Sequence, residues 1–147
     1  MWNFNLFHHR KNNSRLLKPF AFKQRFTVPA SAIDALNHVN NVTYLQWCLD
    51  AAEAHWISKT SEKQREQNVW VVLNHFISYK NPSFLGEELE TQTWIKNYDV
   101  VKSERHYKII RPADGKTIVE AQTLWCFLDG KTFRPTKIPE EIGELFQ

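Results

Sequence analysis

Residues 34–58 read DALNHVNNVTYLQWCLDAAEAHWIS, and the fold follows from this stretch. A polar loop leads to Asn40 and Asn41, and either side chain can cap a helix that we expect to run to about Ser58. Apolar side chains extend most of the way round this helix, at Tyr44, Leu45, Trp47, Cys48, Leu49, Ala51, Ala52, Ala54 and Trp56. Because a helix that is apolar on nearly all sides is usually buried, the sequence predicts a long central helix covered by other elements.

Segments rich in β-branched and aromatic residues on both sides of this helix predict strands. One strand precedes the helix, at residues 20–28, and ends at Pro29. Four strands follow it, at residues 69–79, 88–98, 105–111 and 117–128. The turns between them are short, so we expect an antiparallel meander of four strands whose strong twist wraps the helix. A charged connector at residues 59–67 and a short terminal helix after Pro139 complete the prediction.

The composition is that of one ordinary globular domain. The chain has 147 residues, of which 42% are apolar and 24% charged, so it can bury a core without disulfides or a metal. No apolar run reaches the ~18–20 residues that span a bilayer, so no membrane span is predicted. Cys48 and Cys126 lie in apolar segments and form no C-x-x-C pair. We interpret them as buried free thiols, which favours a cytoplasmic protein.

Charge is distributed unevenly along the chain. Residues 1–33 hold six basic and no acidic groups, and Asp34 is the first carboxylate. We divide the chain into a basic N-terminal extension at residues 1–19 and a single domain at residues 20–147. The positive stretch is short and the remainder is acidic, which does not favour nucleic acid as a partner. Six Trp residues in one short chain favour burial between copies, in a homodimer or homotetramer.

Polar chemistry concentrates in the loop before the predicted helix. Asp34, His38, Asn40 and Asn41 place a carboxylate, an imidazole and two carboxamides within eight residues. A helix start presents unpaired backbone N–H groups and about half a positive charge, which stabilise an electron-rich oxygen. This is the chemistry of an oxyanion site, for which Asp34 would supply the base or nucleophile. The sequence offers no cluster of metal ligands and indicates no cofactor.

This loop also resembles a known signature. Asp34-x-x-Asn37-His38-Val39-Asn40-Asn41-x-x-Tyr44-Leu45-x-Trp47 resembles the D-x-x-G-H-V-N-N-x-x-Y-x-x-W/F pattern of hotdog-fold acyl thioesterases of the 4-hydroxybenzoyl-CoA thioesterase type. Residues 41–47 are also similar to plant acyl-ACP thioesterases. The segments YKNP at 79–82, LGEEL at 85–89 and WCFLD at 125–129 look like later strands of the same family. The resemblance covers about residues 20–142.

The resemblance implies an α+β hotdog fold, in which a strongly twisted antiparallel sheet wraps a long central helix. It implies an acyl-CoA or acyl-ACP thioesterase that works as a dimer or tetramer and needs no cofactor. The Asp34 carboxylate would attack the acyl carbonyl or activate water, while backbone amides around 39–41 polarise that carbonyl. The candidate catalytic residues are thus Asp34, His38 and Asn40, and the candidate substrate-binding residues are Val39, Asn41 and Tyr44.

Two residues depart from these patterns. Asn37 stands where the signature usually has Gly, a tolerable change because Asn also accepts left-handed backbone angles. Leu36 occupies the position where plant acyl-ACP thioesterases carry a catalytic Asn, so we favour a mechanism centred on Asp34. Some branches of the family place the acid on the central helix, which keeps Asp50 and Glu53 as reserve candidates.

Structural roles compete with these functional ones. Asp34 could simply cap a turn, the two asparagines could cap the helix, and Tyr44 could be a core residue. Scattered basic groups could meet the phosphates of CoA or be solvated surface, namely Lys80, Lys102, Arg105, Arg134 and Lys137. Two other functions stay open: a hydratase or dehydratase of acyl thioesters on the same fold, and a non-catalytic acyl-CoA-binding module.

Overall fold

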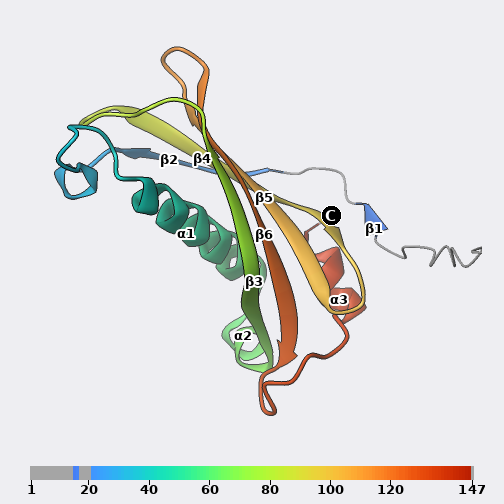
Figure 1. Cartoon of the computed structure of the whole chain (residues 1–147). Helices are drawn as coiled ribbons and strands as arrows, with labels where there is room; N and C mark the ends of the chain where they lie inside the picture. Colours follow the sequence, from blue (N-terminus) through green and yellow to red (C-terminus); the bar gives the residue numbers. More distant parts are fainter. Residues whose placement is uncertain (1–14, 17–20, 147) are drawn as a thin grey trace, which may run out of the picture.

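The computed structural model describes residues 15–16 and 21–146, and it places one long helix against one face of a curved antiparallel sheet (Figure 1). The strands are β1 (Arg15–Leu16), β2 (Phe22–Thr27), β3 (Asn68–Tyr79), β4 (Glu88–Tyr98), β5 (Lys102–Arg111) and β6 (Lys116–Asp129). The helices are α1 (Asn41–Lys59), α2 (Glu62–Gln67) and α3 (Glu140–Glu144), with a 3-10 turn at Ala30–Ala32. The predicted α+β class and hotdog arrangement are confirmed.

The long helix α1 begins at one of its two predicted caps and ends one residue beyond the expected end at about Ser58. The Asn40 side chain accepts a hydrogen bond from the Val42 N–H, at 2.8 Å, and α1 continues to Lys59. Its buried side chains, which pack toward the sheet, are Tyr44, Cys48, Ala51, Ala52 and His55. The opposite side is exposed, however, at positions such as Val42 and Ile57. A single chain therefore buries one face of α1, and the expected cover on nearly all sides is absent among the described residues.

The sheet order differs from the predicted four-stranded meander. The order is β1-β4-β5-β6-β3, with β2 also paired to β4, so only β4, β5 and β6 form a meander. Strand β3 pairs with β6 rather than with β4, because the outer edge of β4 is already occupied by β2. Residues 80–87 consequently cross one end of the sheet, held by hydrogen bonds from Lys80 and Asn81 N–H to the Ile118 carbonyl. This crossing brings the segment next to the start of α1.

Local details also depart from the sequence expectations. The segment 59–67, expected as a connector, contains helix α2, which Ser61 and Gln64 start with a reciprocal capping box. Strand β5 begins at Lys102, three residues earlier than predicted. Of the predicted N-terminal extension, Arg15 and Leu16 pair with Tyr98 and Asn97, and the remainder lies outside the described residues.

The interior holds two apolar clusters. The larger one lies between α1 and the sheet and includes Cys48, Leu89, Tyr107 and Ile109. The second joins Phe127, Ile138 and Ile142 to Trp56 and Trp70 near the C-terminal helix α3. Cys48 and Cys126 are both buried, as predicted. No described helix has the length and hydropathy required to cross a membrane.

A polar pair interrupts this apolar interior. His55 of α1 is 2% exposed, and its Nδ1 accepts a hydrogen bond from the Arg105 Nη1, at 3.1 Å. Burial, together with the charges of Arg105 and Lys59, lowers the pKa of His55 from 6.5 to about 4. His55 is therefore neutral at pH 7 and resists protonation as long as the chain is folded.

We predict that this histidine contributes to acid instability. The unfolded chain protonates His55 near pH 6.5 and the folded chain only near pH 4, so its contribution is complete above pH 6.5 and is lost as the pH falls toward 4. Over that window it should amount to at most about 3 kcal/mol. Urea unfolding at several pH values should show a shallower loss of stability for His55→Gln than for the parent. Equal pH slopes for the two proteins would contradict this.

Candidate active site

The loop before α1 and the segment after β3 enclose a small cavity of about 220 Å³. It brings together four of the six predicted site residues, His38, Val39, Asn41 and Tyr44. The remaining walls, which sequence reasoning did not connect with this loop, are Tyr79, Lys80, Asn81 and Pro82. Asp34 and Asn40 are not among the lining residues, and they shape the loop from outside the cavity.

A tight turn positions Asp34. The Asp34 N–H donates to the His38 carbonyl at 3.1 Å, and the Asn37 N–H donates to the Asp34 carbonyl at 3.0 Å. Asn37 has φ 62°, the left-handed conformation that its position in the signature predicts. The Asp34 Oδ1 accepts from the Leu36 N–H at 2.8 Å, whereas Oδ2 has no hydrogen bond to a described residue. Asp34 thus stabilises the turn with Oδ1, and its Oδ2 is left available to accept a hydrogen bond or to react.

The backbone N–H groups at the start of α1 differ in their partners. The Val39 N–H donates to the Ser83 carbonyl and the Asn40 N–H to the Ala32 carbonyl, each at 2.9 Å. The Val42 N–H is capped by the Asn40 side chain. Of the four N–H groups in residues 39–42, only that of Asn41 has no acceptor among the described residues. Within the predicted group of amides, the available donor is therefore that of Asn41.

Two aromatic hydroxyls fix the walls of this cavity. The Tyr44 hydroxyl lies 2.6 Å from Ser83 Oγ and accepts from the Ser83 N–H at 3.2 Å. Tyr44 is 3% exposed, and burial raises its pKa, so the hydroxyl stays neutral. The Tyr79 hydroxyl donates to the Asn41 carbonyl at 3.2 Å. Tyr44 is therefore a core residue as well as a wall of the cavity.

His38 is half-buried in the same cavity. Its Nδ1 lies 3.3 Å from the Val39 carbonyl oxygen, which can only accept. Nδ1 is therefore the protonated nitrogen of the neutral ring, and Nε2 is left as an acceptor. A water molecule or a substrate N–H is the kind of partner that this nitrogen could bind.

Residues held in reserve lie elsewhere. Asp50 and Glu53 are exposed on α1, and Asp50 accepts a hydrogen bond from the Gln46 side chain at 2.7 Å. Neither carboxylate lines the cavity at the start of α1. Arg105 is only 5% exposed, so the expectation that it belongs to a solvated basic surface is wrong, whereas contact with the phosphates of CoA stays a prediction. Within the described residues no group of three or more metal-ligating side chains is found.

The fold and the loop geometry together define a hotdog-fold protein, and comparison with known proteins agrees. The structure superposes on a 1,4-dihydroxy-2-naphthoyl-CoA thioesterase from Synechocystis with a TM-score of 0.76, over 86% of this chain and 95% of that one, at 17% identity. At sequence level the family model described as thioesterase-like superfamily matches residues 28–146. The chain therefore belongs to the thioesterase-like superfamily.

Curated relatives carry two kinds of name. A putative acyl-CoA thioesterase of Bacillus subtilis is 26% identical over 117 residues, which cover 77% of this chain and 83% of that protein. A chloroplastic acyl-[acyl-carrier-protein] hydrolase of Cuphea viscosissima is 23% identical over 143 residues, or 88% of this chain and 35% of that protein. The chain spans about a third of the length of the plant relatives it matches.

Proposed function

We propose that the chain hydrolyses acyl thioesters, releasing a free acid and a thiol. The observation that carries this proposal is that one short loop holds both Asp34, whose second carboxylate oxygen has no hydrogen bond to a described residue, and, seven residues later, the Asn41 N–H at the first turn of α1, which has no acceptor among the described residues. A base or nucleophile next to a preorganised donor is what acyl transfer requires. Membership of the thioesterase-like superfamily supports the same reaction.

The roles of the individual groups follow from their hydrogen bonds. The Asn41 N–H, aided by the positive end of the α1 dipole, receives the oxygen that becomes negative as the carbonyl carbon turns tetrahedral. Asp34 either attacks this carbon, which gives an acyl-Asp34 anhydride that water then hydrolyses, or removes a proton from a water molecule whose oxygen bonds to the carbon. In both routes the C–S bond breaks as the tetrahedral intermediate collapses, and the thiolate takes up a proton from water or from the protonated carboxyl group of Asp34. Asn40 and Tyr44 are positioning residues, and the Nε2 of His38 can hold the water or the substrate.

The first test removes the charge of Asp34 while keeping its turn. In Asp34→Asn the side-chain oxygen can still accept from the Leu36 N–H, so the loop should keep its shape. We expect thiol release from the best acyl-CoA substrate to fall by about 10²–10⁴-fold, the usual contribution of a general base. A chromogenic thiol assay measures this, and thermal melts check the fold. Parent-like turnover by the folded variant would refute the role of Asp34.

The second test removes a single N–H. Asn41 is the first helical residue, where Pro is well tolerated, and Asn40 has φ −63° and ψ 137°, angles compatible with a following Pro. Asn41→Pro therefore deletes the donor with little effect on the helix, whereas Asn41→Ala keeps it. We expect kcat for thiol release to fall by about 10²–10³-fold in the Pro variant. If both variants retain parental kcat, the Asn41 amide is not the oxyanion donor.

The carrier of the acyl group is the finer part of the proposal. One relative is named for acyl-CoA and another for acyl-ACP. We propose acyl-CoA, because the acyl-CoA relative is matched over 83% of its length. Thiol release across aliphatic and aromatic acyl-CoAs, with acyl-ACP as the alternative, decides this. Consumption of an enoyl-CoA without thiol release would instead indicate a hydratase, and binding without turnover an acyl-CoA-binding module. A cytoplasmic location stays a prediction.

We also propose that the working form is a homodimer or a pair of dimers. Among the strands that the structure describes, β3 has a neighbour, β6, on one side only. Its exposed apolar side chains are Val71, Val72, Leu73, Phe76 and Tyr79. Long apolar edge strands of this kind pair with another chain or aggregate. A second copy joined there would also place its residues beside the cavity that Tyr79 lines.

Light scattering after size exclusion tests this assembly. The parent should elute as a dimer or tetramer, and Phe76→Lys, at a position 64% exposed in the single chain, should elute as a monomer. Val100→Lys, also at an exposed apolar position but in the β4–β5 turn, is the matched control and should leave the mass unchanged. A monomeric parent would overturn the proposal.

A further inference from the structure

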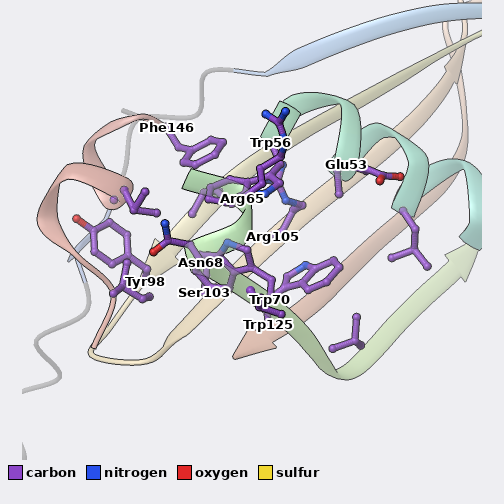
Figure 2. Close-up of a pocket in the computed structure, with 18 residues that line it drawn as sticks. Glu53, Trp56, Arg65, Asn68, Trp70, Tyr98, Ser103, Arg105, Trp125 and Phe146 are labelled. Atoms are coloured by element: carbon purple, nitrogen blue, oxygen red, sulfur yellow. The ribbon is translucent and has the colours of Figure 1, made fainter. Parts of the chain in front are cut away.

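A second, larger cavity of about 430 Å³ lies beside the C-terminal half of α1 (Figure 2). Most of its wall is apolar and includes Leu49, Trp56, Trp70, Ile138 and Phe146. The volume is within the usual range of small-molecule pockets. No residue lines both this cavity and the one near His38. Leu49 is eight residues after Asn41, or about 12 Å along the helix.

The polar groups in this wall are mainly hydrogen-bond donors. Arg105, from β5, is 5% exposed. The Trp125 Nε1–H, from β6, is buried and makes no hydrogen bond to a described residue. Ser103 lies two residues before Arg105, on the same face of β5, and pairs with Trp125 across the sheet. All three residues line the cavity, as Figure 2 shows.

Arg105 has no carboxylate partner among the described residues. Its Nη1 donates to His55 Nδ1 and Thr93 Oγ1, each at 3.1 Å, and the Phe146 ring lies 5.7 Å from its central carbon. Nε and Nη2 donate to no described residue. By contrast, Arg25 and Arg111 each pair with two carboxylates. Arg65, in the same lining, also has no carboxylate partner among the described residues, but it is only half-buried and donates to the carbonyl and hydroxyl of Thr60. Arg105 is thus the one buried arginine among the described residues, and it has no counter-charge.

The guanidinium is charged under ordinary conditions. Burial lowers the pKa of Arg105 to about 10, which still leaves it protonated at pH 7, and its neighbour His55 is neutral there. A buried cation without an anion is costly, and the cost is reduced by a ligand that supplies one. Glu53 is the only acidic residue in the lining, and its side chain is solvent-exposed on α1.

We propose that this cavity binds an apolar carboxylate, whose hydrocarbon chain or ring packs on the aromatic wall and whose carboxylate pairs with Arg105. The planar guanidinium is suited to a carboxylate, because the three N–H groups on its Nε and Nη2 are available in addition to the two on Nη1 that are already bonded. Two kinds of ligand carry both an apolar part and a carboxylate. One is an acyl thioester substrate with a second carboxylate at the far end of its acyl chain, and this possibility rests on the proposed function. The other is a free carboxylic acid, such as a hydrolysis product.

Calorimetric titration of the intact protein tests the site without using its activity. The ligands are octanoate and dodecanoate at pH 7.5, each compared with the primary alcohol of the same length. We expect the carboxylate to bind about ten- to a hundred-fold more tightly than the alcohol, the usual effect of a hydrogen bond to a charged group. Arg105→Met should abolish this selectivity and leave alcohol binding intact, which a purely structural role of Arg105 would not do.

Two further variants keep the result interpretable. Arg105→Lys retains the charge and should keep part of the selectivity even if the Met variant does not fold. Lys102→Gln removes an exposed cation from the same strand and should change nothing. Equal binding of carboxylate and alcohol by the parent, absence of carboxylate binding up to millimolar concentration, or unchanged selectivity in both Arg105 variants would each overturn the proposal.

A kinetic arm separates the two kinds of ligand. Thiol release is compared for an ω-carboxyacyl-CoA and the methyl-terminated acyl-CoA of equal length. A preference for the ω-carboxy substrate that disappears in Arg105→Met identifies the substrate as the ligand. Carboxylate binding without such a preference identifies a free acid. If no acyl-CoA is hydrolysed at all, the proposed function fails, while the calorimetric result still decides whether the carboxylate site exists.

Discussion

The start of α1 is anchored to two separate parts of the chain, and the rest of the structure depends on this anchoring. The Val39 N–H bonds to the carbonyl of Ser83, in the segment that crosses from β3 to β4, while the Asn40 N–H bonds to Ala32, which follows β2. The Tyr44 hydroxyl adds a buried bond to Ser83. These contacts fix the position of the helix relative to the sheet. Together with the Asn40 cap, they provide an acceptor for each backbone N–H of residues 39–42 except that of Asn41. The same bonds that build the fold therefore leave the Asn41 N–H as the donor without an acceptor in residues 39–42, within the part of the chain that the structure describes.

Local signals were sufficient for much of this architecture. The two candidate caps, Asn40 and Asn41, located the start of α1 to within one residue, and the left-handed Asn37 was predictable from its place in the loop. Alternating residues gave the bounds of β4 without error. Helix α2 was missed although its signal was present, because Ser61 and Gln64 form a capping box within a segment whose charges suggested a connector. Attention to cap residues would have found it.

Long-range features were beyond such reasoning. The pairing of β3 with β6 depends on β2 having taken the free edge of β4, and no residue in β3 encodes that competition. Arg105 was classed with surface cations on its charge. The alternation along β5 indicates that Arg105 is buried. Ser103, Tyr107 and Ile109 are spaced from it by even numbers of residues, so they lie on the same face of the strand, and all three are buried. The contacts with His55 and Phe146 join distant parts of the chain, so the sequence could not show what surrounds the guanidinium.

Among the described strands, β3 is an unpaired edge of the sheet, and through Tyr79 at its end it is also a wall of the small cavity. A chain that pairs along this edge would lie about 4.8 Å from β3, the spacing of neighbouring strands. Such a neighbour would also limit how far Tyr79 can move, and Tyr79 holds the carbonyl of Asn41. Under the assembly proposed above, the conformation of residues 34–41 would therefore depend on whether a second chain is paired with β3. Dilution, which separates paired chains, would then change the shape of this loop.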